Sequence, residues 1–311
     1  MTQTVIADSG VAARQAGESW RAEYPFEPHW LDIGGQKLHY VDERPADEGK
    51  QASDEPLLCL HGNPTWSFLY RKVVTALRPR RRVIALDHMG CGLSDKPQAY
   101  RYTLKQHIDN AEKLVNHLGL REITLCVHDW GGAIGFGLAA RRPELFKRFV
   151  VFNTAAFAST RIPLSISICR VPGFGALAIR GFNAFVRGAL ARCSVKPLSR
   201  AAREGFLAPY ANWHDRVANL RFVQDIPMRA SHPSYATLAD IDQSLHKLAD
   251  RPMLICWGAH DFVFNDQFLA GWRKRFPAAE VHRFEHAGHF VLEDAHEDII
   301  PLMQRFIGDA I

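Results

Sequence analysis

A carboxylate lies at a position typical of a nucleophile. Residues 127–132 read Val-His-Asp-Trp-Gly-Gly, so Asp129 stands between an apolar run and two glycines. A strand that ends in a polar residue and turns at once into a helix forms a nucleophile elbow, because small neighbours permit the sharp turn. A carboxylate exposed there can attack a saturated carbon and form an ester with it. Asp129 could instead cap the helix N-terminus, and this segment alone leaves both interpretations open.

Two further segments supply partners for such a nucleophile. Asp261 ends the segment Trp-Gly-Ala-His-Asp after one predicted strand, and His289 lies in His-Ala-Gly-His-Phe after the last one. The segment Leu-His-Gly-Asn-Pro at 60–64 lies between a strand and a helix, where an oxyanion-hole loop is found. The chain order Asp129, Asp261, His289 matches nucleophile, acid and base of the α/β-hydrolase topology. We therefore predict a hydrolytic triad.

Short apolar runs alternate with longer helix-like segments along most of the chain. A hairpin is predicted around Gly34 and Gly35, from strands at 29–32 and 37–41. Further strands are expected at 57–60, 82–86, 123–127, 149–152, 253–257 and 280–285. Helices are expected at 67–77, 104–118, 132–141 and 265–276. This alternation predicts an α/β fold with a mostly parallel central sheet flanked by helices.

The alternation stops between about residues 155 and 240, where Phe, Ala and Arg are frequent. We predict an inserted helical cap at 155–240, a core formed by 25–154 and 241–311, and an N-terminal extension at 1–24. The cap phenylalanines are expected to form the cap's own core, with one or two lining an apolar pocket. They are Phe174, Phe182, Phe185, Phe206 and Phe222.

The motifs resemble those of the haloalkane dehalogenases, members of the α/β-hydrolase superfamily, from about Pro25 to the C-terminus. The resemblance implies that Asp129 is the nucleophile, His289 the base and Asp261 the acid that orients His289. It also implies that Asn63 and Trp130 bind the leaving halide through a side-chain amide and an indole N–H. One dehalogenase subgroup takes its acid from the position of Asn153, which cannot ionise. The pattern is therefore similar to the third subfamily, whose members are often oligomers, so a homo-oligomer is possible.

Parts of the cap resemble a second group, the β-lactone decarboxylases of long-chain olefin synthesis. The similar segments are 152–157, 182–185, 209–213 and 221–227. These enzymes share the dehalogenase triad, so the triad cannot separate the two reactions. We rank hydrolytic dehalogenation (haloalkane and water to alcohol and halide) first and β-lactone decarboxylation second. Either substrate is small and apolar, and neither reaction requires a metal or organic cofactor.

Two less favoured functions remain. Tyr210 and Tyr235 could form the tyrosine pair with which epoxide hydrolases activate the epoxide oxygen, although that family usually has an aromatic residue where Asn63 stands. A binding protein that keeps the hydrolase pocket without turnover is disfavoured by the intact triad. His286 and His289 have helix-like spacing, but no third ligand accompanies them, so no metal site is predicted.

The charge is concentrated in one segment. Net charge is +5 and the isoelectric point is near 8.9, but residues 155–235 carry 11 Lys and Arg against 3 Asp and Glu. No nucleic-acid-binding motif accompanies this excess, so nucleic acid is not an expected partner. We favour a solvated outer face whose long stems cover apolar helices. The alternative is an interface to a partner subunit, an acidic protein or an anionic membrane. The arginines at 78 and 80–82 are expected in a solvated turn.

The expected compartment is the cytoplasm. Six cysteines occur without a Cys-x-x-Cys motif, and Cys59, Cys126 and Cys256 lie in apolar runs, as buried reduced thiols do. The first 17 residues contain no apolar core of a signal peptide. Residues 162–179 come nearest to a membrane span, but Arg170, two prolines and two glycines interrupt them.

Overall fold

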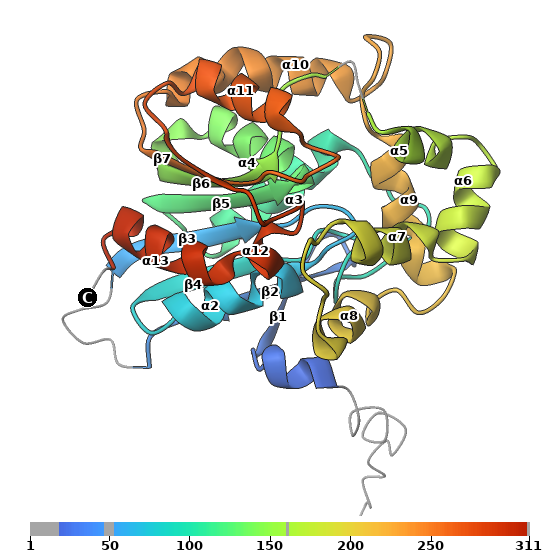
Figure 1. Ribbon diagram of the computed structural model, residues 1–311, viewed down its shortest axis with the longest axis horizontal. Helices are drawn as coiled ribbons and strands as arrows, with labels where there is room; N and C mark the ends of the chain where they lie inside the picture. Colours follow the sequence, from blue (N-terminus) through green and yellow to red (C-terminus); the bar gives the residue numbers. More distant parts are fainter. Residues whose placement is uncertain (1–18, 47–52, 160–161, 310–311) are drawn as a thin grey trace, which may run out of the picture.

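Eight strands pair into one sheet in the computed structural model, which describes residues 19–46, 53–159 and 162–309 (Figure 1). The strands are β1 (Pro28–Asp32), β2 (Lys37–Glu43), β3 (Ser53–Leu60), β4 (Arg81–Leu86), β5 (Ile123–Asp129), β6 (Phe146–Thr154), β7 (Met253–Gly258) and β8 (Glu280–Phe284). Their order is β1-β2-β4-β3-β5-β6-β7-β8. β2 runs antiparallel to β1 and to β4, and all other pairs are parallel. The predicted mostly parallel α/β sheet is confirmed.

Helices cover both faces of the sheet, as Figure 1 shows. One face carries α3 (Leu104–His117), α4 (Trp130–Arg141), α10 (Tyr235–Ser244) and α11 (Asp266–Arg275), and the other carries α2 (Arg71–Leu77), α12 (Val291–Asp294) and α13 (His296–Ile307). Every residue of the central strand β5 is buried, which explains why its sequence is almost continuously apolar. No helix is expected from the sequence after residue 285, yet α12 and α13 lie there.

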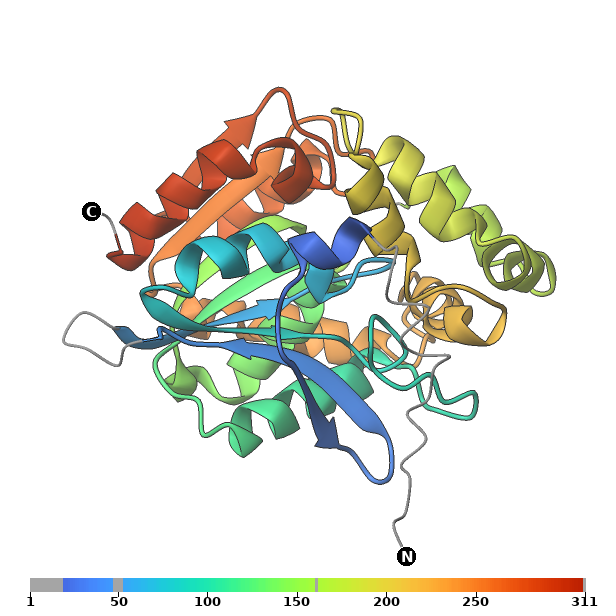
Figure 2. The ribbon, with the colours of Figure 1, turned by 90° about the horizontal axis from the view of Figure 1, so that it is seen from below.

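A group of helices between β6 and β7 lies to one side of the sheet in both views (Figures 1 and 2). It contains α5 (Leu164–Cys169), α6 (Phe174–Ala176), η4 (Leu177–Gly181), α7 (Ala184–Arg192), α8 (Arg200–Leu207), η5 (His214–Arg216) and α9 (Val217–Gln224). We call helices α5 to α9 the cap. The domain boundaries stay a prediction, and α10, which spans the predicted boundary at 240, packs on α3 and α4 of the core. None of the helices in the described residues is both long and apolar enough to cross a bilayer.

The described part of the predicted N-terminal extension is packed against the protein. Residues 1–18 lie outside the described residues, but Ser19–Glu23 forms the short helix η1, which contacts α8. The Trp20 ring lies edge-on to Trp66 at a centroid distance of 5.7 Å, within a buried aromatic cluster that also contains Phe68. Trp66 and Phe68 are therefore packing residues.

Arg81 does not lie in a solvated turn, as the sequence suggested, but forms a buried ion pair. Its guanidinium group donates to both carboxylate oxygens of Asp309, at 2.5 and 2.6 Å, and to the carbonyl of Ile307 at 3.1 Å. Arg81 and Asp309 are nearly inaccessible to solvent. The pair fixes the start of β4 to the chain beyond α13. The prediction of a solvated turn is therefore wrong for Arg81.

Asp309→Asn is expected to lower the free energy of unfolding by about 3 kcal/mol, because it leaves a buried guanidinium without its counter-ion. Asp42→Asn is the matched control, since Asp42 pairs with the partly exposed Arg82. That change is expected to cost about 1 kcal/mol or less. Urea unfolding of both variants measures the difference, and equal losses would contradict the assignment of a buried pair.

Candidate active site

Asp129 occupies the sharp turn between β5 and α4. Its backbone has φ 51° and ψ −125°, a conformation that residues with a side chain rarely adopt. The turn is possible because neighbouring positions lack side chains: a Cβ atom on Gly62 would lie 1.9 Å from Oδ1 of Asp129, and one on Gly131 would lie 1.9 Å from the Leu60 carbonyl oxygen. The Thr154 hydroxyl donates to the backbone carbonyl of Asp129 and fixes the turn from β6.

The carboxylate of Asp129 makes no capping hydrogen bond to α4, so the helix-cap interpretation does not hold. Its Oδ1 atom accepts a hydrogen bond from the backbone N–H of Asn63 at 2.6 Å. The backbone N–H of Trp130, the first residue of α4, also stabilises the charged form of this carboxylate and lowers its pKa. Two backbone donors thus converge on one side chain, which is the arrangement that stabilises an anionic oxygen when the carboxyl carbon is attacked.

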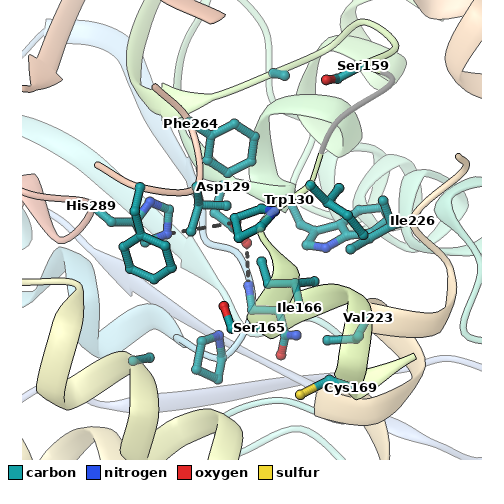
Figure 3. A pocket seen from close by; sticks show the side chains of 18 of the residues that line it. Asp129, Trp130, Ser159, Ser165, Ile166, Cys169, Val223, Ile226, Phe264 and His289 are labelled. Atoms are coloured by element: carbon teal, nitrogen blue, oxygen red, sulfur yellow. Dashed lines mark hydrogen bonds and ion pairs between the residues drawn. The ribbon is translucent and has the colours of Figure 1, made fainter. Parts of the chain in front are cut away.

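Behind Asp129, His289 and Asp261 form a hydrogen-bonded pair. Nδ1 of His289 lies 2.7 Å from Oδ2 of Asp261. Nε2 of His289 lies 3.8 Å from Oδ2 of Asp129 (Figure 3). A carboxylate can only accept, so Nδ1 carries the proton and Nε2 is the free base of the neutral ring. Asp261 is itself oriented by the backbone N–H groups of Val263 and Phe264, at 2.6 and 3.0 Å. The structure thus brings Asp129, Asp261 and His289 together.

Burial and charge shift both titrating groups of this arrangement. Burial raises the pKa of Asp129 above 3.8, which outweighs the opposing effects of the His289 charge and the two N–H donors. Burial lowers the pKa of His289, but the charge of Asp261, the hydrogen bond to it and the charge of Asp129 together raise the pKa above 6.5. The two carboxylates thus favour the charged form of His289, whereas burial disfavours the charged form of Asp129.

Asn63 and Trp130 line the same cavity as Asp129 and His289. Nδ2 of Asn63 donates to the backbone carbonyl of Asn219 in α9 at 3.1 Å, so a cap helix sets the orientation of this amide. The Trp130 ring packs against Phe222, also in α9, with centroids 5.3 Å apart. Both side chains are thus held between the core and the cap.

The cavity has a volume of about 250 Å³ and lies between the core and the cap. Its wall is mainly apolar: Phe264 lines it from the core, Ile166 and Val223 from the cap, and Ile226 from the segment after α9 (Figure 3). Phe157 also lines it. The wall also contains a cluster of polar groups, which belong to Asn63, Asp129, Trp130 and His289. Such a cavity suits an apolar molecule whose reactive end meets the carboxylate.

Comparison with known proteins shows the family to which this fold belongs. The sequence profile of the alpha/beta hydrolase fold family matches residues 55–296. The chain belongs to the α/β hydrolase fold family. It is 46% identical over 292 residues to the cis-3-alkyl-4-alkyloxetan-2-one decarboxylase of Shewanella oneidensis, with 92% of this chain and 89% of the relative covered. The decarboxylase of the same name from Xanthomonas campestris is 42% identical, with 91% of this chain and 97% of the relative covered.

Haloalkane dehalogenases are more distant relatives of this α/β hydrolase. Haloalkane dehalogenase 2 of Mycobacterium bovis is 32% identical over 289 residues, which cover 91% of this chain and 96% of the relative. Among solved structures, haloalkane dehalogenase DbeA from Bradyrhizobium elkani superposes with a TM-score of 0.80 at 25% identity, covering 91% of this chain and 98% of that one. Both resemblances recognised in the sequence are confirmed, and the protein is an enzyme of the α/β hydrolase superfamily.

Two residues that the sequence analysis missed hold the His289 loop of this hydrolase. Nε2 of the buried His128 lies 2.8 Å from the His289 carbonyl oxygen and donates to it. The carboxylate of the buried Asp294 accepts a hydrogen bond from the backbone N–H of Gly288 at 2.8 Å. It also accepts hydrogen bonds from two backbone N–H groups of the loop after α7. His128 directly precedes Asp129 in the sequence, and that adjacency was the available signal. Asn153, by contrast, exchanges two hydrogen bonds with the Gly258 backbone and holds β6 to β7.

The predicted aromatic residues of the cap have three different environments. Phe185 lines the cavity, as expected of one or two of them. Phe206 and Phe222 are buried, but against the hydrolase core and not in a core of the cap's own. Phe174 and Phe182 are 53% and 69% exposed, so the prediction that they belong to the cap's core is wrong. Phenylalanine periodicity in the sequence cannot distinguish an inward from an outward face when both faces of a helix are apolar.

Proposed function

We propose that this enzyme decarboxylates β-lactones that carry two alkyl chains, releasing an alkene and carbon dioxide, with Asp129 as the nucleophile. The observation that carries the proposal is the Asp129 carboxylate, held by two N–H groups at the wall of an apolar cavity. The relatives named as decarboxylases of cis-3-alkyl-4-alkyloxetan-2-ones are 46% and 42% identical, against 32% for the dehalogenase. For this reason we now rank decarboxylation above dehalogenation.

The first step is displacement at C4, the saturated ring carbon that is bonded to the ring oxygen. An oxygen of Asp129 bonds to that carbon, the carbon–oxygen bond of the ring breaks, and its electron pair stays on the leaving oxygen as a carboxylate. Asn63 and Trp130 donate side-chain N–H groups to this developing anion. Hydrogen bonds to a charged acceptor are stronger than neutral ones, and a dry apolar cavity increases their effect.

The second step restores the nucleophile without consuming water. The bond between the carboxylate carbon and the neighbouring carbon C3 breaks, and its electron pair forms the double bond between C3 and C4, the carbon that Asp129 attacked. The ester bond to Asp129 breaks at the same time, and carbon dioxide leaves. Protonated His289, whose pKa is raised, stabilises the negative charge that returns to Asp129. Asp261 keeps the imidazole ring in position.

Hydrolytic dehalogenation is the second candidate, and the intact His289–Asp261 pair favours it. Asp129 would displace the halide, which Asn63 and Trp130 would bind. Neutral His289 would then deprotonate a water molecule that attacks the carboxyl carbon of the ester, and the N–H groups of Asn63 and Trp130 would stabilise the resulting oxyanion. The products are an alcohol and halide.

Two other functions have less support. Tyr210 donates its hydroxyl to the Thr65 carbonyl at 3.3 Å, and neither Tyr210 nor Tyr235 is among the described residues that line the cavity. The tyrosine pair of an epoxide hydrolase is thus not placed to activate an epoxide. A ligand-binding role without turnover does not explain why Asp129, His289 and Asp261 are arranged with these charges and hydrogen bonds.

Product analysis tests the proposal. Purified enzyme is incubated separately with a long-chain cis-β-lactone and with 1-bromobutane or 1,2-dibromoethane, in water enriched in heavy oxygen. We expect alkene from the lactone, with no heavy oxygen entering Asp129. Dehalogenation would release halide and would introduce heavy oxygen into the Asp129 carboxylate, as peptide mass spectrometry can detect. Halide release without any alkene would replace our first candidate by the second.

The pH dependence of haloalkane hydrolysis should have two limbs. Protonated His289 cannot accept a proton from water, so the rate falls as the pH drops through the raised pKa of His289, above 6.5. A second loss occurs where Asp129, whose pKa is raised by burial, becomes protonated and ceases to be a nucleophile. Asp261→Asn removes the charge that raises the pKa of His289. It should therefore move the limb that belongs to His289 to lower pH. An unmoved limb in a stopped-flow pH series would refute this assignment.

A further inference from the structure

The outer side of the cap carries a cluster of exposed apolar side chains. We call it the outer cap patch, and its members are Leu164, Ile168, Val171, Phe174, Leu177 and Phe182. Leu164 and Phe182 are 75% and 69% exposed, which is high for large apolar residues. These residues come from α5, α6, η4 and their connections, which lie at the edge of the molecule away from the sheet in both ribbon views (Figures 1 and 2).

The spacing of these residues makes them neighbours. Leu164, Ile168 and Val171 are spaced four and three residues apart, which places them along one side of α5 and its continuation. The backbone N–H of Phe182 donates to the Leu177 carbonyl at 3.1 Å, so the far end of the patch is also held together. The opposite side of α5 is apolar as well, because Ile166 and Cys169 line the cavity.

Arginines flank the patch. The Arg180 guanidinium lies 4.6 Å from the ring centroid of Trp213, which is itself 47% exposed. Arg187 and Arg221 are exposed, and the Arg221 charge lies near enough to act on Arg180. The surrounding segment 155–235 has 11 basic against 3 acidic residues. Exposed apolar side chains within a cationic border are the surface that an anionic bilayer complements, because arginine pairs with lipid phosphate.

The cavity reaches the surface beside this patch. Most lining residues are buried or half-buried, but Ser165, Ala184 and Arg192 are exposed. Ser165 follows Leu164 in α5, and Ala184 begins α7 two residues after Phe182. We therefore propose that the outer cap patch docks this enzyme on anionic phospholipid bilayers, with the cavity opening beside the lipid. Docking does not depend on which reaction Asp129 performs, but it would let an apolar substrate pass from lipid to the cavity.

Vesicle co-sedimentation of the full chain tests the proposal. The vesicles are phosphatidylcholine alone, and equal parts of phosphatidylcholine and phosphatidylglycerol. We expect binding to the anionic vesicles that weakens as sodium chloride is added. The double variant Phe174→Ser, Phe182→Ser should bind about tenfold more weakly, since it removes two side chains that insert among the lipids. Neither residue lines the cavity, so alkene or halide formation from a short, water-soluble substrate should be unchanged.

Trp30→Ser is the matched control. Trp30 is an aromatic residue of the edge strand β1 that is 48% exposed and is not part of the outer cap patch, so its loss should leave vesicle binding unchanged. Failure of the wild type to bind either vesicle, or equal binding by the double variant, would overturn the proposal. The proposal would also be overturned if the wild type did not bind vesicles but associated with itself or with an acidic protein, and the double variant abolished that association. None of these outcomes bears on the proposed reaction, which is measured separately.

Discussion

Asp129→Asn is expected to lower kcat/KM by about 10⁴-fold or more, for the β-lactone and for any haloalkane alike. An amide cannot form the ester on which both reactions depend. Asn tolerates positive φ, and its carbonyl oxygen can accept the same hydrogen bonds from Asn63 and Trp130. Alkene or halide release under initial-rate conditions measures the loss.

The same variant should be at least as stable as the wild type. Burial raises the pKa of Asp129, so the folded state binds the proton more tightly than the unfolded chain and loses stability as pH rises through that pKa. Removing the charge therefore raises the unfolding temperature near neutral pH. Asp225→Asn is the matched control, because Asp225 is equally buried and accepts hydrogen bonds from Leu104 and Ser234, but is not among the described residues that line the cavity. Comparable activity losses in the two variants would count against Asp129 as nucleophile.

His289→Phe is expected to separate the two candidate reactions. With a haloalkane, loss of the base should slow ester hydrolysis by about 10²–10⁴-fold, so the intact protein gains the mass of one alkyl group. With a β-lactone, the second step needs no water, so alkene formation should continue at a reduced rate without a stable adduct. Phe fits the site because the His289 ring already stacks on Phe264, with centroids 5.8 Å apart.

Intact-mass spectrometry and peptide mapping provide the measurement. The adduct should map to the peptide that contains Asp129, and Asp129→Asn combined with His289→Phe should show none. An adduct that maps to Cys169 or Cys193, which also line the cavity, would mean simple alkylation of a thiol. Absence of any adduct with haloalkanes, epoxides or β-lactones, together with no alkene, would contradict covalent catalysis.

The core of the fold and the positions of the polar residues at the strand ends were predictable because local sequence determines them. The buried strand before Asp129 and the glycines after it leave few alternatives to a tight turn. Parallel strands then place the residues at their carboxyl ends along one edge of the sheet, so Asp129, Asp261 and Asn63 meet there. All eight strands lie where the apolar runs predicted them, within a few residues.

Features that depend on distant contacts were not predictable. Arg81 lies in a run of arginines that reads as solvated, and only its ion pair with Asp309, more than 200 residues away, makes it buried. The outward direction of Phe174 and Phe182 likewise depends on how short cap helices pack. His128 has no distinctive sequence pattern beyond its neighbour Asp129, yet it supports the His289 loop.

Any separation of α9 from the core breaks the hydrogen bond from Asn63 Nδ2 to the Asn219 carbonyl and frees that amide to rotate. An anion held by Asn63 and Trp130 would then lose an oriented donor at the moment an exit path opens. Product departure and cap opening would form one kinetic event, and the slowest step of turnover could be read from cap motion. Transplanting a cap from a relative would consequently alter leaving-group preference together with chain-length preference, although the catalytic residues stayed the same.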